Sequence, residues 1–262
     1  MHPVITSNSN PKIKHLISLD KSRERKKLGL FVIEGLKELM LAESNGYEIE
    51  SVFYSTHLIE GATLQKAGFQ KSQLWAVGQN VFEKIAYRES TGGVIGIARH
   101  KSHLLDDLKL SKNPLLLILE GVEKPGNLGA ILRTADAAGV DAVIICDPQT
   151  DFYNPNVIRS SIGCVFTNQT AAATSDETIA WLKEKQIKIF CTYLGGSIPY
   201  TSASFQQPCA IVMGSESSGL TDAWIKNSDT NIIIPMKGKI DSMNVSVSAA
   251  IVVFEALRQR QL

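Results

Sequence analysis

Long apolar segments are missing from this sequence of 262 residues. No hydrophobic run approaches the roughly 20 residues that a helix needs to cross a bilayer, which argues against an integral membrane protein. The opening segment MHPVITSNSNPKIKH also lacks the apolar stretch of a secretory signal. Because 44% of the residues are hydrophobic and 20% are charged, the composition is that of a globular protein, and we expect a cytoplasmic one.

Cysteine and histidine are scarce and are poorly spaced for metal binding. The sequence has four cysteines and five histidines, without a C-x-x-C pair or an H-x-x-x-H spacing. This argues against the common zinc-binding patterns. Each cysteine lies in or beside an apolar run, so we expect buried, reduced thiols and no metal site at Cys146, Cys164, Cys191 and Cys209.

A strong excess of charge of one sign is also absent, because the formal net charge is +1. Residues 1–30 nevertheless carry seven basic side chains and two carboxylates, a charge of +5 that leaves −4 for the remainder. Two interpretations remain open: a basic arm that neutralises nucleic-acid phosphates, and a solvated amphipathic helix. The candidate phosphate-binding residues are Lys12, Lys14, Arg23, Arg25, Lys26 and Lys27.

Residues 31–100 contain short, alternating elements. SVFYS, LWAVG and GGVIGIARH are rich in β-branched and aromatic residues, which predicts strands, whereas LKELMLAES and VFEKIAYRES are typical of helices. This alternation predicts a small α/β sandwich. Residues 101–113 are polar, charged and without a clear period, which indicates a linker.

Residues 114–262 contain longer elements. The segments LLLILEGV, AVIIC, IKIFCTYL, CAIVMG and NIIIPM are the near-continuous apolar strands of a parallel sheet that is buried on both faces. Helices are expected between them, so the pattern predicts an open parallel α/β sheet with helices on both faces. The last helix, at about 244–260, is apolar nearly all round, and we expect it to pack on the sheet and against a partner subunit.

Glycine-punctuated segments follow the ends of several predicted strands. In KPGNLGAILRTADAAG, Asn127 is a suitable helix N-cap, and Arg133 is spaced to pair with Asp136 one turn later. In AIVMGSESSGL, glycines and Glu216 follow a strand at the edge where open α/β sheets bind ligands. Each segment, taken alone, also fits an ordinary connection between a strand and a helix.

A further segment, IIIPMKGKIDSMNVSVSAA, follows the last predicted strand, and either Ser242 or Asn244 is expected to cap the helix after it. In this order, the three segments resemble the signature motifs of the SpoU/TrmH family of RNA 2′-O-methyltransferases. The matching residues are Asn127, Gly129 and Arg133; Gly214, Glu216, Gly219 and Leu220; and Ile234, Pro235, Met236, Ser242, Asn244, Val245 and Ser246. The resemblance covers about residues 113–262, and residues 31–100 look like the ribosomal-protein-like RNA-binding domain of many relatives.

The resemblance implies a deep trefoil knot, a homodimer formed through the knot helices, and S-adenosylmethionine as cofactor. It implies that the cofactor is held bent in the knot loops, and the positions that match its binding residues are Leu194, Gly195, Gly214, Ile234, Met236, Asn244 and Val245. Many relatives have glycine where this chain has Ser217, a change expected to narrow the pocket or alter the loop dihedrals.

The resemblance assigns the removal of the ribose proton to Arg133. Because arginine is effectively always protonated in proteins, we expect Arg133 instead to bind an adjacent phosphate and to stabilise developing negative charge. Asn127, Glu216, Ser242 and Asn244 would orient the arginine and the ribose.

The sequence therefore predicts an arm at 1–30, an RNA-binding domain at 31–100, a linker at 101–113 and a knotted methyltransferase domain at 114–262. The predicted activity is methylation of a ribose 2′-hydroxyl in RNA, with ribosomal RNA favoured by the two-domain layout. A transfer RNA methyltransferase and a catalytically silent RNA-binding or ribosome-assembly module remain alternatives. A dinucleotide oxidoreductase is disfavoured, because the G-x-G-x-x-G fingerprint is missing.

Overall fold

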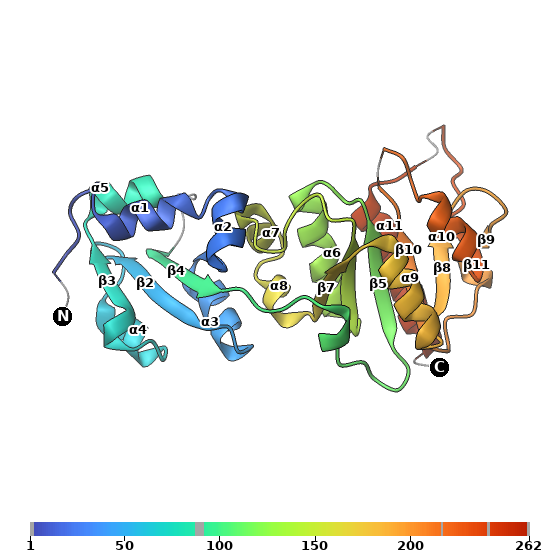
Figure 1. The fold of residues 1–262 in the computed structure, drawn as a ribbon, viewed down its shortest axis with the longest axis horizontal. Helices are drawn as coiled ribbons and strands as arrows, with labels where there is room; N and C mark the ends of the chain where they lie inside the picture. Colours follow the sequence, from blue (N-terminus) through green and yellow to red (C-terminus); the bar gives the residue numbers. More distant parts are fainter. Residues whose placement is uncertain (1–2, 87–91, 216, 240–241, 261–262) are drawn as a thin grey trace. The chain divides into compact units, whose positions relative to one another are not determined.

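The computed structural model describes residues 3–86, 92–215, 217–239 and 242–260 (Figure 1). The chain forms two compact units. Unit 1 comprises Met1–Lys101 together with Asp151–Thr167, and unit 2 comprises Ser102–Thr150 together with Asn168–Leu262. The predicted limits therefore differ from the structure in one respect: a segment from the middle of the C-terminal region folds as part of the N-terminal unit.

Unit 1 is built on a four-stranded sheet in the order β1-β4-β2-β3. Its central strand β4 is antiparallel to both β1 and β2, whereas β3 is parallel to β2. The strands are those expected from the β-branched and aromatic segments: β1 (Leu30–Glu34), β2 (Ile49–Ser55), β3 (Leu74–Val77) and β4 (Val94–Arg99).

The predicted N-terminal arm is not a separate part of the molecule. Residues 11–28 form two helices, and Ile13 and Leu16 of the first lie in the core with Phe53 and Ile95 of the sheet. The first helix is thus amphipathic, with its apolar face in the core, and binding of phosphates by the exposed basic residues stays a prediction. The helices of unit 1 are α1 (Pro11–Ser18), α2 (Ser22–Leu28), α3 (Leu36–Ser44), α4 (Gly61–Lys66), α5 (Gln79–Ile85), α7 (Pro155–Ser160) and α8 (Cys164–Thr167).

A buried ion pair fastens the segment 151–167 to unit 1. The Arg25 side chain is only 2% exposed, and its guanidinium donates to Asp151 Oδ2 at 2.8 Å. It also donates to the carbonyl oxygens of Leu19 and Asp20, at 2.9 and 2.7 Å. The expectation that Arg25 binds RNA is therefore wrong, because this arginine is buried and both of its terminal nitrogens donate hydrogen bonds inside the protein.

Aromatic rings from the same segment complete the packing. Tyr153 stacks on Phe31 with 4.1 Å between ring centroids, and Phe166 meets Tyr47 edge-on at 5.1 Å. Tyr153 also stacks on His100 at 4.3 Å. Because these rings come from both parts of the sequence, this aromatic cluster is complete only when residues 151–167 are in place.

Unit 2 contains a seven-stranded sheet in the order β7-β6-β5-β10-β8-β11-β9. Every pairing in it is parallel. The sheet predicted from the apolar runs is present, and it is extended at its edges by β7 and β9, which are too short to be predicted from sequence. The strands are β5 (Leu115–Glu120), β6 (Ala142–Cys146), β7 (Thr170–Ala173), β8 (Lys188–Thr192), β9 (Ile198–Pro199), β10 (Cys209–Met213) and β11 (Thr230–Ile233).

Helices cover both faces of this sheet, as predicted (Figure 1). On one face Leu182 and Trp224 pack against Leu116 and Ile118, which alternate along β5. The opposite face of the sheet carries α6 and α11, two long helices that pack on each other. The helices of unit 2 are α6 (Pro125–Ala138), α9 (Ser175–Glu184), α10 (Asp222–Asn227) and α11 (Val245–Arg260).

The cysteines form no disulfide. Cys146, Cys191 and Cys209 are buried and Cys164 is half-buried. Burial raises the pKa of the Cys146 thiol to about 12 and that of Cys191 to about 11, so both are protonated and unreactive near neutral pH. Among the described residues there is no cluster of side chains suited to a metal ion, and no described helix is long and apolar enough to span a membrane.

We predict that Arg25→Met lowers the free energy of unfolding of unit 1 by about 3 kcal/mol, because it leaves the Asp151 carboxylate without its cation. Urea unfolding followed by circular dichroism measures the change. Arg23→Met is the matched control, because Arg23 is exposed and its loss should cost less than about 0.5 kcal/mol. Equal effects of the two substitutions would contradict a structural role for the buried pair.

Candidate active site

The carboxyl ends of β8, β10 and β11 surround a cavity of about 500 Å³ in unit 2. Parallel strands bring these ends to one edge of the sheet, where the connecting loops can approach a ligand. The cavity is lined by Lys124, Thr192, Tyr193, Leu194, Met213, Gly214, Ser215, Gly219, Ile232, Ile233, Ile234, Met236, Ser242, Met243, Asn244, Val245, Ser248 and Val252. Apolar side chains predominate, and the polar ones come mainly from loops and helix starts.

The loop after β10 is folded back tightly on itself. Ser215 and Gly219 exchange two backbone hydrogen bonds of 3.1 Å each. A Cβ atom at Gly214 would lie 2.6 Å from both the Gly219 carbonyl oxygen and the Leu220 nitrogen, so only glycine fits there. Gly219 has a φ of +68°, a value that also favours glycine. The glycine pattern of this segment therefore serves the closure of a compact loop at the cavity wall.

A buried carboxylate anchors the end of this loop. Glu120, the last residue of β5, is 4% exposed. Its Oε2 accepts a hydrogen bond from the Thr221 nitrogen at 2.8 Å, and its Oε1 accepts from the Thr221 hydroxyl at 2.7 Å. Ser175 Oγ lies 3.1 Å from the same Oε1 and accepts a hydrogen bond from the indole of Trp224 at 3.0 Å. These contacts hold the loop exit against the sheet and the buried face of α10.

Helix α6 begins earlier than the sequence pattern indicated. Its N-cap is Lys124 and Pro125 occupies the first turn, so Asn127 lies inside the helix and does not cap it. Proline is favoured at the first helical position, where a missing N–H costs nothing. The expected N-cap role of Asn127 is therefore wrong.

The Asn127 side chain joins the start of α6 to the start of α11. Asn244 Nδ2 donates to Asn127 Oδ1 at 3.1 Å. Asn244 Oδ1 in turn accepts from the Ser246 nitrogen at 3.0 Å and from the Ser246 hydroxyl at 2.6 Å, which caps α11. One asparagine thus caps a helix with its oxygen and bridges to a second helix with its nitrogen.

The structure brings most of the predicted cofactor residues to this cavity. The predicted cofactor residues that line it are Leu194, Gly214, Ile234, Met236, Asn244 and Val245. Ser242, a predicted catalytic residue, also lines it. Gly195 is described by the structure but is not one of the lining residues. Glu216 lies outside the described residues. Ser217 is described, and its expected effect on the width of the pocket or on the loop dihedrals stays a prediction.

Arg133 lies apart from the cavity. It is exposed on α6, six residues beyond Asn127, which is a rise of about 9 Å along the helix. It does not line this cavity. The side chain is accessible from solvent, because Arg133 is exposed.

Several residues that line this cavity belong to no pattern that identifies them as site residues from the sequence. Thr192 and Met213 belong to strands and would pass as core, while Ser248 and Val252 lie on a helix that the sequence marks only as apolar. Lys124 begins the first motif segment, but it is not one of the residues that carry the resemblance. Their role follows from proximity to the cavity, which a one-dimensional pattern does not contain.

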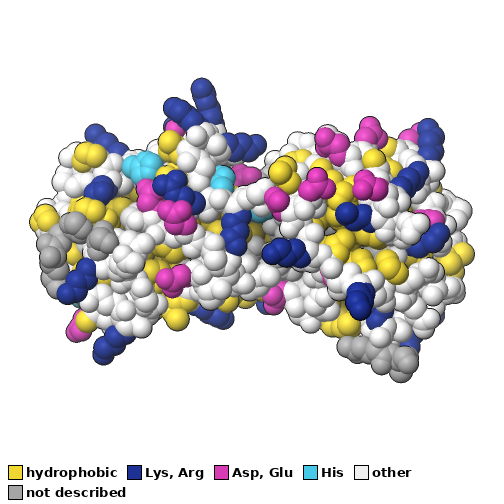
Figure 2. Space-filling model, turned by 60° about the horizontal axis from the view of Figure 1, so that its bottom comes forward, with side chains coloured by type: hydrophobic (Ala, Val, Ile, Leu, Met, Phe, Trp, Pro, Cys, Tyr) yellow, Lys and Arg dark blue, Asp and Glu magenta, His cyan; other side chains and the backbone are white. Residues whose placement is uncertain are grey.

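The remaining basic candidates in unit 1 are exposed. Lys12 and Lys14 project from α1, with Lys12 Nζ 3.9 Å from the ring centroid of Trp75. Arg23, Lys26 and Lys27 project from α2. Figure 2 shows Lys and Arg side chains projecting together at the upper edge of the view. These side chains can reach a polyanion without rearrangement of the core.

We predict that Asn244→Ala lowers the free energy of unfolding by about 1 kcal/mol, because it removes the side-chain cap of α11. Asn244→Asp keeps the capping oxygen and should retain most of this stability. Chemical unfolding of the two variants measures the difference. An Asn244→Asp protein as unstable as Asn244→Ala would show that the bridge to Asn127, and not the cap, carries the stability.

Known proteins are similar to this chain in both sequence and fold. A 23S rRNA guanosine-2′-O-methyltransferase of Bacillus subtilis, RlmP, is 28% identical over 251 residues, which are 95% of this chain and 97% of that protein. A crystal structure of an RNA 2′-O ribose methyltransferase is 39% identical, with a TM-score of 0.86 over 99% of this chain and 100% of that one. The AdoMet-bound rRNA methyltransferase of Sinorhizobium meliloti has a TM-score of 0.90 at 29% identity, covering 98% and 97%.

Two family matches agree with the units of the structure. Residues 10–96 match the MRM3-like substrate binding domain, a span that includes α1 and α2 and so agrees with their place in the core of unit 1. Residues 114–254, which contain the cavity and every motif segment, match the SpoU rRNA Methylase family. The chain belongs to the SpoU rRNA methylase family.

Proposed function

We propose that this protein transfers a methyl group from S-adenosylmethionine to a ribose 2′-hydroxyl of ribosomal RNA. The observation that carries the proposal is the convergence of three motif segments, from β5–α6, β10 and β11–α11, on one edge of the unit 2 sheet. The names of the relatives support the substrate, because they describe rRNA 2′-O-methyltransferases. The nucleotide is left open, since the names of these relatives include both guanosine and uridine enzymes.

The cavity fits the proposed cofactor. Its volume of about 500 Å³ lies within the range of about 300–1,000 Å³ that is usual for small-molecule sites. Leu194, Ile234 and Met236 offer apolar contacts suited to an adenine ring, and the tight turn at Gly214 allows close approach to the backbone. Bound S-adenosylmethionine supplies an electrophilic methyl group, and these residues would hold it in place.

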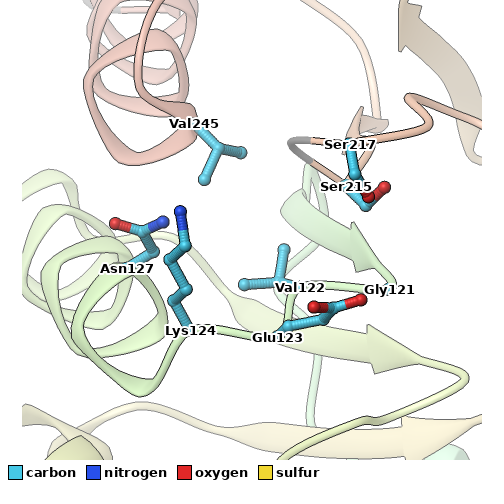
Figure 3. Close-up of a pocket in the computed structure, with 8 residues that line it drawn as sticks. All are labelled: Gly121, Val122, Glu123, Lys124, Asn127, Ser215, Ser217 and Val245. Carbon is cyan, nitrogen blue, oxygen red and sulfur yellow. The ribbon is translucent and has the colours of Figure 1, made fainter.

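The side chains around the cavity act by orientation and charge. Asn127, at the start of α6 (Figure 3), and Asn244 are hydrogen-bonded to each other, so their side chains are held in place beside the proposed position of the acceptor ribose. Ser242 lies in the same wall. Arg133 stays cationic, so we assign it to an RNA phosphate and to the stabilisation of negative charge that develops on the 2′-oxygen, and not to proton removal.

Unit 1 is proposed to select the RNA. Its exposed Lys12, Lys14, Arg23, Lys26 and Lys27 give a positive surface that neutralises phosphates without reading the base sequence. Such a surface suits structured RNA, which proteins recognise mainly by shape and backbone.

A homodimer is proposed through α11, within the knotted arrangement that the family resemblance implies. Val247 is 48% exposed and Phe254 is 47% exposed, and both lie in α11, in which apolar residues outnumber polar ones. Ile251 lies between them on the same helical stripe, and it is half-buried. An exposed apolar stripe on a helix is suited to a self-complementary interface around a two-fold axis.

We predict that the purified protein binds S-adenosylmethionine in calorimetry and transfers its labelled methyl group to 23S rRNA from an unmodified source. Arg133→Ala should reduce turnover at saturating RNA at least 100-fold, the scale expected for one electrostatic contact to the transition state. The cofactor affinity should stay within about twofold, because Arg133 does not line the cavity.

Three outcomes would contradict this assignment. Near-normal turnover of Arg133→Ala would remove that residue from the reaction. RNA binding without cofactor binding at millimolar concentration would favour a silent RNA-binding module. Methylation of transfer RNA in place of ribosomal RNA would move the substrate to the other branch of the family.

We predict that Phe254→Glu converts the protein to a monomer, because it places a charge in the proposed apolar interface. Sedimentation equilibrium measures the mass directly. Leu58→Glu in unit 1 is the matched control, since Leu58 is 60% exposed and lies far from α11 in sequence. A wild-type protein that sediments as a monomer would overturn the proposed dimer.

A further inference from the structure

Glu120 is a buried carboxylate that the proposed mechanism does not use. It is the last residue of β5, it is 4% exposed, and it does not line the cofactor cavity. Burying a carboxylate costs free energy unless hydrogen bonds to the charged group compensate for the lost water. A charged residue at this strand end therefore has to be explained by the groups that it holds.

The loop after β10 starts and ends beside this carboxylate. β5 and β10 are neighbouring parallel strands, with Leu119 opposite Met213. One residue further along, Glu120 and Gly214 leave the two strands at the same edge of the sheet. The loop then returns at Thr221, whose nitrogen and hydroxyl donate hydrogen bonds to the two carboxylate oxygens. The carboxylate thus fastens the exit of the loop next to its entrance.

This loop forms part of the wall of the cofactor cavity. Gly214, Ser215 and Gly219 all line the cavity. Two backbone hydrogen bonds between Ser215 and Gly219 make the turn compact. Because the turn is compact, a displacement of its exit would move the lining residues with it.

Thr221 gives up a helix cap for its contact with Glu120. It is the N-cap of α10, and within the described chain its side chain makes no capping hydrogen bond. Threonine is favoured at an N-cap because its hydroxyl can accept from an N–H of the first turn. Here the hydroxyl donates to Glu120 Oε1 at 2.7 Å. A local helix contact is therefore replaced by a contact to β5, which indicates a demand from outside the helix.

Two other contacts near the loop exit fix its direction less well. Leu220 is 7% exposed and packs in the core of unit 2, but an apolar contact is not directional. The Ser175 hydroxyl lies 3.1 Å from Glu120 Oε1 but only 2.6 Å from Asp147 Oδ2, and it has a single proton to donate. Thr221 therefore supplies the main hydrogen bonds to Glu120.

We propose that Glu120 is a positioning residue for S-adenosylmethionine, acting through Thr221 on the loop that lines the cavity. The inference rests on the proposed function, which assigns the cavity to this cofactor, and it adds a residue that lies outside the cavity lining. The carboxylate keeps the wall in the shape that binds the cofactor. Because a preformed wall needs less ordering on binding, loss of the contact should weaken cofactor affinity more than it slows methyl transfer.

The experiment compares the wild-type full-length protein with Glu120→Gln, Thr221→Val and Thr221→Ser. Thr178→Val is the matched control, because Thr178 is fully buried on α9, donates its hydroxyl to the Thr174 carbonyl oxygen and lies outside the cavity lining. Calorimetry with S-adenosylmethionine gives the Kd and the number of binding sites. Methylation of 23S rRNA at saturating RNA gives kcat and the KM for the cofactor.

Glu120→Gln and Thr221→Val should each raise the Kd for S-adenosylmethionine about tenfold, the scale of one hydrogen bond to a charged group. The number of binding sites should equal that of the wild type, the KM for the cofactor should rise with the Kd, and kcat should stay within about threefold. Thr221→Ser keeps the hydroxyl, so its Kd should lie within about twofold of the wild-type value, as should that of Thr178→Val.

Loss of the fold cannot imitate this result. Reversible unfolding raises the apparent Kd in inverse proportion to the folded fraction, so a tenfold effect would require about nine-tenths of the protein to be unfolded. Circular dichroism at the assay temperature measures that fraction. Irreversibly unfolded protein would lower the number of binding sites and leave the Kd unchanged.

Kd values of Glu120→Gln and Thr221→Val equal to that of the wild type would overturn the proposal. So would an equal rise in Thr178→Val, or a rise that Thr221→Ser shares. Cofactor binding is measured without RNA, so these outcomes are separate from a failure of the proposed function. A wild-type protein that does not bind S-adenosylmethionine would refute the function, whereas a binding wild type with unaffected variants would refute only the role of Glu120.

Discussion

The hydrogen bond from Asn244 Nδ2 to Asn127 Oδ1 holds together the two helix starts from which the site is built. This hydrogen bond can form because α6 and α11 pack on each other over the same face of the sheet, and both helices begin at the edge where the parallel strands end. The neighbouring loop depends on a comparable constraint, since Glu120 fastens Thr221 through two hydrogen bonds in a buried setting. The Glu120 side chain is held by its burial, and Asn244 is also held by its hydrogen bonds to Ser246, so these parts of the cavity wall are organised without a ligand.

Unit 1 shows how a basic segment can be partly structural. Arg25 is surrounded by the carbonyl oxygens of residues 19 and 20 and by the Asp151 carboxylate, while its neighbours Lys26 and Lys27 face the solvent. Asp151 belongs to a segment that follows the second strand of unit 2 in the sequence. The proposed RNA-binding surface and the catalytic unit are therefore linked by a packed insertion and not only by a linker.

Sequence periodicity was sufficient to predict the parallel sheet and the helices on both of its faces, because these follow from local patterns of apolar residues, whereas the three motif segments were identified by their family resemblance. The N-cap of α6 was predicted wrongly at Asn127, although Pro125 marks the first helical position in the sequence. Nor did periodicity separate Arg25 from the exposed basic residues, because burial depends on a partner 126 positions away. The amino-acid sequence alone determined which elements form and which family they resemble. The tertiary structure alone decided which side chains share a cavity, because that depends on distances between strand ends that are remote along the chain.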